Sequence, residues 1–375
     1  MGAVAAGGWL PEHQSHALFT TAHVNNIVAN LTSVLERYQS GEPVTLERRV
    51  TATEEHMVLV GIAPLPQAVS RLFADALNAA RNALEHCLFA EVGHRLDRPL
   101  SGQESKALEV PALTRLEDFE TWAKNKYRAS TDLLAPGDDL YERLLRLQPL
   151  QRKDSDVHPL RILTAHTNYA KHREPSLSVT RVAQVTRDSD LTRKPMDSLE
   201  IMEVGEVLAS VPLGTRELFS IWPEVAVQRP HTGQWLTLMK EVGETVDWVR
   251  TIALPILIMG RTDLPRIPPQ LNIDIAYDST DAAWSAAGEI PAAKAMQNAI
   301  GAAGLRVSML DMLVLTYGEG ARDAFRRWFA AMDDATVMAR VWPVLEAATR
   351  HNHGRYAFAI AEWAAEAGVD ASDVN

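Results

Sequence analysis

Cysteine is almost absent from this chain of 375 residues, which holds only Cys87. A single cysteine excludes a disulfide framework and a cysteine zinc site within one chain. Long hydrophobic runs are also missing: the longest, IALPILIM at 252–259, is interrupted by Pro255 and is far shorter than the roughly 20 residues that span a bilayer. The first residues carry neither the basic segment nor the continuous apolar core of a signal peptide. We therefore expect a cytoplasmic protein without a membrane or targeting segment.

Several motifs that bind phosphates or metals are missing as well. The chain has no glycine-rich phosphate loop and no Gly-x-Ser-x-Gly nucleophile turn, and the pair Asp333-Asp334 lacks the companion carboxylates of a magnesium site. His13 and His16 stand three residues apart after Glu12, as a metal pair would, but no spaced third ligand follows. We expect solvated or packing histidines there, and we predict no metal and no cofactor.

Positive charge is scarce, since the net charge of the chain is −11. This balance argues against a protein that binds nucleic acid over its whole surface, because affinity for phosphates requires local positive charge. Between residues 151 and 195, however, nine lysines and arginines stand against five aspartates and glutamates. The middle of the chain is therefore locally basic and suits an anionic ligand, although a solvated charged face gives the same pattern.

Helical periodicity, by contrast, is abundant. The longest pattern, at 66–92, repeats apolar residues every three or four positions over about seven turns, which predicts one long amphipathic helix. Two short β-rich runs predict a hairpin at 44–62, and several runs rich in Val and Ile predict a β-rich insert at 177–228 that forms an antiparallel sheet. Further helices are expected at 13–39, 116–129, 140–147, 158–174 and 235–252, with a loop at 93–110.

The proline-rich stretch LPRIPPQ at 264–270 predicts a domain boundary. We therefore divide the chain into a helical domain at 1–262, which carries the hairpin and the insert, and a helical C-terminal domain at 263–375. In the second domain a strand is expected at 271–277 and helices at 292–303, 305–316, 320–332, 335–350 and 356–367. The predicted fold class is α+β and mainly α: a helical bundle with a small antiparallel β element and a helical C-terminal part.

Two clusters of polar side chains lie on predicted helices. Opposite the apolar stripe of the long helix lie Asn82 and His86, with Arg81 at the border of that stripe. These groups bind phosphates and move protons, whereas a solvent-facing helix usually carries Lys and Glu. Near the end of the helix at 158–174, Asn168 and His172 share a face, and Lys171 and Arg173 flank them. These seven residues of the two clusters form the candidate site.

The string RNALEH at 81–86 resembles the motif of the HEPN superfamily, in which an arginine and a polar residue are followed by three residues and a histidine. Members of that superfamily are helical bundles, and many are metal-independent ribonucleases that act as dimers. The resemblance implies that Arg81 and His86 form the catalytic pair and that Asn82 orients it. Members paired with nucleotidyltransferase antitoxins have a tyrosine where Leu88 stands here, which argues against that form of regulation.

A wider resemblance covers residues 15 to about 258. The pieces ADALNAARNALEHCL, LQPL and NYAKHREP are similar to segments of a family of actinobacterial proteins without an established activity. This resemblance supports the limits of the first domain, and it does not extend beyond Pro265.

The chemistry of the two clusters can also be argued without the resemblance. Cleavage of RNA without a metal needs a base for the 2′-hydroxyl, an acid for the leaving 5′-oxygen and cations for the charge that develops on phosphorus. His86 and His172 would supply the base and the acid, with Arg81, Lys171 and Arg173 as the cations. The hypothesis is a metal-independent endoribonuclease that binds RNA as a homodimer, in the role of a toxin or phage-defence effector with an antitoxin or defence protein as partner.

Two alternatives stay open. The clusters can form a non-catalytic site for RNA, a nucleotide or a protein on a helical scaffold. They can also be buried polar packing, because Arg81 and Glu85 are four residues apart on one helix and suit an ion pair. In that interpretation the amides and imidazoles hydrogen-bond between helices.

Overall fold

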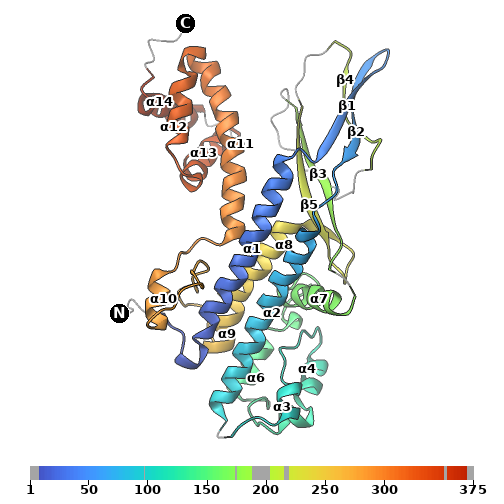
Figure 1. Ribbon diagram of the computed structural model, residues 1–375, viewed down its shortest axis with the longest axis vertical. Helices are drawn as coiled ribbons and strands as arrows, with labels where there is room; N and C mark the ends of the chain where they lie inside the picture. Colours follow the sequence, from blue (N-terminus) through green and yellow to red (C-terminus); the bar gives the residue numbers. More distant parts are fainter. Residues whose placement is uncertain are drawn as a thin grey trace. The chain divides into compact units, whose positions relative to one another are not determined.

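The computed structural model describes residues 8–96, 98–173, 175–187, 203–214, 219–349 and 353–369 (Figure 1). Its helices and two small antiparallel sheets confirm the predicted α+β, mainly α class. The chain forms two compact units, residues 1–293 and 294–375. The division lies after the predicted boundary at 262/263 because the intervening segment packs on the first unit: Ile267, Leu271 and Ala283 are buried, and Trp9 Nε1 donates to the carbonyl of Pro265 at 2.7 Å.

The core of the first unit is built on two long helices, α1 (His16–Ser40) and α2 (Gln67–Arg95), which lie side by side (Figure 1). Pro66 precedes α2 and suits its start, because proline has no amide hydrogen to lose and a backbone angle already close to helical. The predicted helix at 66–92 is therefore confirmed. Most of its apolar stripe is buried, and the large side chains that are fully buried are Phe73, Leu77, Leu84 and Leu88.

A third long element is interrupted by a proline. It begins with α8 (Leu238–Trp248), continues through a π-helical turn (Val249–Ala253) and ends with α9 (Leu254–Met259). Pro255 has no amide hydrogen and its ring clashes with the carbonyl four residues earlier, so the helix widens just before it. Gly260 then ends the helix with φ of 69°, a left-handed conformation that glycine adopts without strain.

The strands divide between two sheets. The predicted hairpin is confirmed as β1 (Val44–Val50) and β2 (Glu54–Ile62), and β4 (Val207–Pro212) pairs with the far edge of β2. The second sheet has the order β3 (Ser178–Arg187), β5 (Phe219–Gln228) and β6 (Trp235–Thr237). The insert thus forms antiparallel strands as predicted, but they do not make one sheet. Part of it, residues 188–202 with the basic Arg193 and Lys194, lies outside the described residues.

Shorter helices surround this core. They are η1 (Glu12–Gln14), α3 (Gly102–Ala107), α4 (Leu116–Ala123), α5 (Lys126–Ala129), α6 (Asp139–Arg146), η2 (Pro149–Gln151), α7 (Pro159–His172) and α10 (Thr280–Ala286). The helix α3 stands in the predicted loop, where Ser101 and Glu104 form a reciprocal capping box. The predicted strand at 271–277 is irregular backbone without strand pairing.

The C-terminal unit is helical, as predicted. It contains most of α11 (Ala292–Tyr317), then η4 (Glu319–Ala321), α12 (Arg322–Ala330), α13 (Asp334–Thr349) and α14 (His353–Glu366). The two helices predicted at 292–303 and 305–316 are one, and α11 is the one helix in the described part of the chain that is long and apolar enough to cross a membrane. Its residues Leu305, Met309 and Leu313 are buried in the core of this unit.

The start of α7 depends on a buried histidine. His158 caps this helix, because its Nδ1 accepts the amide hydrogen of Leu160 at 3.1 Å, and its ring packs edge-on against Trp248. Burial, with a smaller contribution from the charge of Arg152, lowers the pKa of His158 from 6.5 to about 4. Only the neutral ring can cap, because protonation of Nδ1 removes the acceptor.

We predict that His158 makes the fold sensitive to mild acid. Between pH 6.5 and about 4 the unfolded chain binds a proton at this ring that the folded chain does not, so stability falls as the pH falls through this range. His158→Asn keeps a capping acceptor that does not titrate. In urea unfolding at pH 7, 6 and 5, the loss of stability should be smaller for this variant than for the parent. Equal losses would contradict the assignment, and His23→Asn, at an exposed position of α1, is the matched control.

Candidate functional site

Arg81 is buried and all its hydrogen bonds serve packing. Its Nε donates to Glu85 Oε1 at 2.7 Å, its Nη1 to Thr164 Oγ1 at 2.6 Å and its Nη2 to the carbonyl of Val110 at 2.9 Å. Glu85 Oε2 in turn accepts the amide hydrogen of Val110 at 2.8 Å. The guanidinium therefore ties α2 to α7 and to the segment at Val110, and it does not face solvent where a phosphate would bind.

His86 faces another neighbour. Five residues along a helix correspond to a rotation of about 140°, so His86 does not share a side of α2 with Arg81. Its ring lies 6.4 Å from that of His16 on α1, and both His86 and Asn82 are exposed. In this chain the structure does not bring Arg81 and His86 into one site.

The second predicted cluster lies elsewhere. The helix α7 contacts α2 where His166 packs against Phe73 and where Thr164 meets Arg81. Along α7, the chain passes from Thr164 at Arg81 to His166 at Phe73, so His172 lies toward the start of α2. His86 lies past Arg81 in the opposite direction, toward the end of α2. The two histidines therefore diverge from the crossing, and the described residues show no contact between them. The remaining members of the cluster, Asn168, Lys171 and Arg173, are exposed with His172 at the end of α7.

The structure instead brings histidines of η1 and α1 against histidines of α2. His13 stacks on His94, with ring centroids 3.8 Å apart and planes within 9° of parallel, and His16 lies one turn along, beside His86. The sequence contains a signal for this arrangement. His86 and His94 are eight residues apart and share a face of α2, and His13 and His16 are three residues apart, about one helical turn. What it does not contain is the pairing across the two helices.

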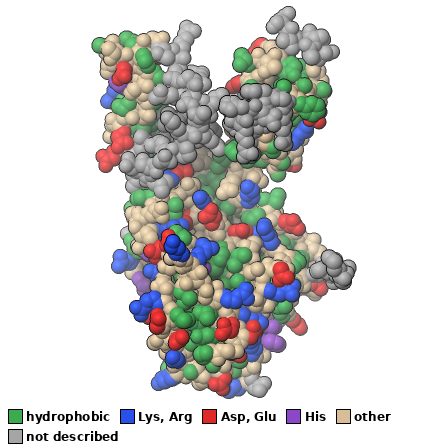
Figure 2. Space-filling model, turned by 180° about the vertical axis from the view of Figure 1, so that it is seen from behind, with side chains coloured by type: hydrophobic (Ala, Val, Ile, Leu, Met, Phe, Trp, Pro, Cys, Tyr) green, Lys and Arg blue, Asp and Glu red, His purple; other side chains and the backbone are tan. Residues whose placement is uncertain are grey.

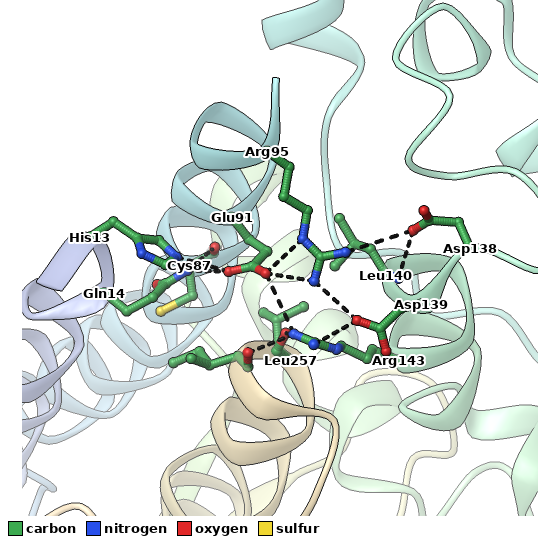
Figure 3. Close-up of polar contacts among 11 residues, drawn as sticks. His13, Gln14, Cys87, Glu91, Arg95, Asp138, Asp139, Leu140, Arg143 and Leu257 are labelled. Atoms are coloured by element: carbon green, nitrogen blue, oxygen red, sulfur yellow. Dashed lines mark hydrogen bonds and ion pairs between the residues drawn. The ribbon is translucent and has the colours of Figure 1, made fainter. Parts of the chain in front are cut away.

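A buried carboxylate, Glu91, holds this end of the bundle together (Figure 3). It accepts hydrogen bonds from His13 Nε2 at 3.0 Å, Gln14 Nε2 at 3.2 Å and Arg95 Nε at 2.8 Å, and it is 5% exposed. Burial alone would raise the pKa of Glu91, but the hydrogen bonds from His13, Arg95 and Gln14 outweigh it and lower the pKa. Glu91 is therefore ionised at neutral pH.

Arg143 extends this network to α6 and α9 (Figure 3). Its Nη2 pairs with Asp139 at 2.6 Å, and its Nη1 donates to the carbonyls of Leu257 and Ile258 at 3.1 and 2.5 Å. Those carbonyls end α9, where the helix itself offers no amide partner. Asp139 also accepts from Arg95. The network therefore fixes the ends of three helices around the carboxylate.

His13 and His94 line an open hollow of about 760 Å³. Its other lining residues are Pro11, Glu12, Glu91 and Ile258. Because the ionised carboxylate of Glu91 can only accept, His13 Nε2 donates this hydrogen bond, and in the neutral ring Nδ1 is then the acceptor. The exposed ring of His94 is in the last turn of α2. This arrangement can provide a base and an acid side by side.

Neighbouring groups are less suited to chemistry. Burial, followed by the charge of His86, lowers the pKa of His16, so this ring stays neutral. Burial, with Glu91, raises the pKa of Cys87 to about 12, so its thiol is not a nucleophile near neutral pH. Among the described residues no three His, Cys, Asp or Glu side chains are arranged to hold a metal ion.

A second buried network contains a serine, a histidine and a glutamate. His166 Nδ1 lies 2.6 Å from Ser176 Oγ, and its Nε2 lies 3.3 Å from Glu241 Oε1. Arg229 holds both oxygens of Glu241 at 2.7 and 2.8 Å. All four side chains are buried, and a substrate cannot reach Ser176. The network ties α7 to α8 and to the end of β5, and we interpret it as packing.

Comparison with known proteins adds no assignment. No family model matches the chain, and no curated protein or solved structure matches it either. A function must therefore be argued from the site itself.

We predict that Arg81 contributes to stability and that His86 does not. Arg81→Ala leaves the Glu85 carboxylate and the Val110 carbonyl without their donor, and should lower the free energy of unfolding by about 1–3 kcal/mol. His86→Ala removes an exposed side chain and should change it by less than about 0.5 kcal/mol. Urea unfolding measures both. Arg71→Ala, at an exposed position of the same helix, is the control, and an Arg81→Ala variant as stable as this control would contradict the packing role.

Proposed function

We propose that this protein is a metal-independent endoribonuclease of the cytoplasm whose acid–base pair is His13 and His94. The observation that supports the proposal is the stack of these two imidazoles in an open hollow, with one ring fixed by the ionised Glu91. Histidine is the side chain whose unperturbed pKa suits both proton transfers near neutral pH. The proposal replaces His86 and His172 as the acid–base pair, because those two residues lie apart.

In the proposed reaction His13 Nδ1 takes the proton of a ribose 2′-hydroxyl, and the 2′-oxygen forms a bond to the adjacent phosphorus. The bond from phosphorus to the 5′-oxygen of the next nucleotide breaks, and protonated His94 gives its proton to that oxygen. The products are a 2′,3′-cyclic phosphate and a free 5′-hydroxyl. Glu91 is a positioning residue, because it holds the tautomer and the orientation of His13 and does not contact the substrate.

A homodimer is part of the proposal. Within one copy, the cationic end of α7 with Lys171, His172 and Arg173 is separate from the hollow. A second copy can bring this end to the hollow and supply the positive charge that phosphodiester cleavage requires. An antitoxin or defence protein is the partner class that such an effector would need.

The test is RNA cleavage in EDTA. Purified protein and labelled RNA should give 2′,3′-cyclic phosphate ends, and His94→Ala should slow the reaction by about 10²–10⁴-fold, the usual contribution of a general acid. His13→Gln should do the same, and its amide still donates to Glu91, so the fold is kept. His23→Ala, on an exposed part of α1, is the control.

Three results would contradict the proposal: activity that EDTA abolishes, activity that both variants retain, or no cleavage at all. If activity is lost in His86→Ala and His172→Ala but kept in His13→Gln and His94→Ala, the enzyme acts through the pair that the sequence indicated.

A non-catalytic scaffold that binds RNA, a nucleotide or a protein is the second candidate. It is favoured by the packing role of Arg81 and by the exposed cationic end of α7, where Arg173 lies over the ring of Tyr169 at 5.4 Å. Positive and negative side chains are interspersed over the face shown in Figure 2, so this face offers no broad positive surface to an anionic ligand. RNA binding without cleavage, weakened by Lys171→Ala and Arg173→Ala, would select this function.

A further inference from the structure

We propose that the hollow beside His94 binds a guanine base, which makes the proposed ribonuclease selective for guanosine. The selectivity for guanosine rests on the proposed function. Binding of the base does not, since it can be measured without cleavage. It is carried by the stacked imidazoles, by the carboxylate of Glu12 and by the apolar walls of the hollow.

The stacked imidazoles offer a surface for a planar base. His13 and His94 are nearly parallel at 3.8 Å, so they already form two layers of an aromatic stack, and His94, which is exposed, is its outer layer. A planar heteroaromatic ring can continue such a stack, as nucleobases do on histidine and other aromatic side chains. Pro11 and Ile258 supply apolar surface in the same hollow. The hollow is open, and its volume of about 760 Å³ leaves room for a purine base.

The carboxylate of Glu12 can recognise the edge of the base. Glu12 lines the hollow and is exposed, and among the described residues its carboxylate forms no hydrogen bond or ion pair. A carboxylate offers two acceptors, and guanine presents two adjacent donors, N1–H and the N2 amino group. Adenine and cytosine each set one amino donor beside a ring-nitrogen acceptor, and uracil sets its N–H between two carbonyls. Guanine is therefore the base whose edge matches Glu12.

The charge of the lining residues decides which part of a nucleotide can enter the hollow. Arg95 and Arg143 compensate the charge of Glu91, whereas Glu12, which has no ion-pair partner among the described residues, leaves a negative charge in the lining that disfavours a phosphate there. A neutral base is not disfavoured. The base would therefore occupy the hollow while its ribose and phosphates stay at the rim, which is where the imidazoles must meet the 2′-hydroxyl.

The experiment is a calorimetric titration of the full chain with GMP, AMP, CMP and UMP in EDTA. GMP should bind at least about tenfold more tightly than the other three, because only it pairs with both oxygens of a carboxylate. His94→Ala should weaken GMP by roughly 5- to 100-fold through the lost stacking. Glu12→Gln should abolish the preference for GMP while leaving weak binding of all four. Glu36→Gln and His23→Ala, both at exposed positions of α1, are the matched controls.

The outcomes separate the two proposals. Selective GMP binding without any RNA cleavage supports the base site and overturns the nuclease. Cleavage after all four nucleotides, with no preference in the titration, overturns the base site and leaves the nuclease standing. Selective GMP binding that Glu12→Gln and His94→Ala do not affect places the nucleotide elsewhere on the chain and also overturns this inference.

Discussion

The end of the bundle that carries the candidate site depends on one buried carboxylate. Glu91 is ionised and almost inaccessible, and an isolated charge in such a place would cost several kcal/mol. It is tolerated because donors converge on it from η1, from α2 itself and, through Arg143, from α6. Each donor must be held where it is, so the positions of η1, α6 and the end of α9 follow from the need to satisfy this charge. The position of His13 beside His94 follows from the way η1 is held against Glu91.

The same requirement explains why the arginine of the most recognisable motif is not at the surface. Arg81 is bound by Glu85, Thr164 and Val110, in the way that Arg229 is bound by Glu241 farther along the core. A charged side chain on the covered face of a helix cannot reach solvent, so its hydrogen-bond partners must lie inside the protein. A polar residue at the border of an apolar stripe is therefore ambiguous: its spacing fits a catalytic motif and a tie between helices equally well.

Local patterns predicted the elements, and contacts between distant segments decided the rest. The helix at 66–92 and the hairpin at 44–62 were predictable because a 3.6-residue period and alternating β-rich runs are properties of the local sequence. The transfer of β4 to the hairpin and the continuity of α11 across the expected break depend on long-range packing, to which a local period is blind. The stack of His13 on His94 also depends on long-range packing. It requires η1 and α2 to meet in one particular register, which the periodicity of neither segment specifies.

The two rings of this stack are held very differently, and that difference suits an acid–base role. His13 is oriented by a buried carboxylate that is itself fixed by three helices, so its free nitrogen has a defined direction before any substrate arrives. His94 is exposed at the last turn of α2, where its ring is accessible to solvent. This difference supports the proposed acid–base pair, because one ring has a fixed orientation and the other is accessible to a substrate.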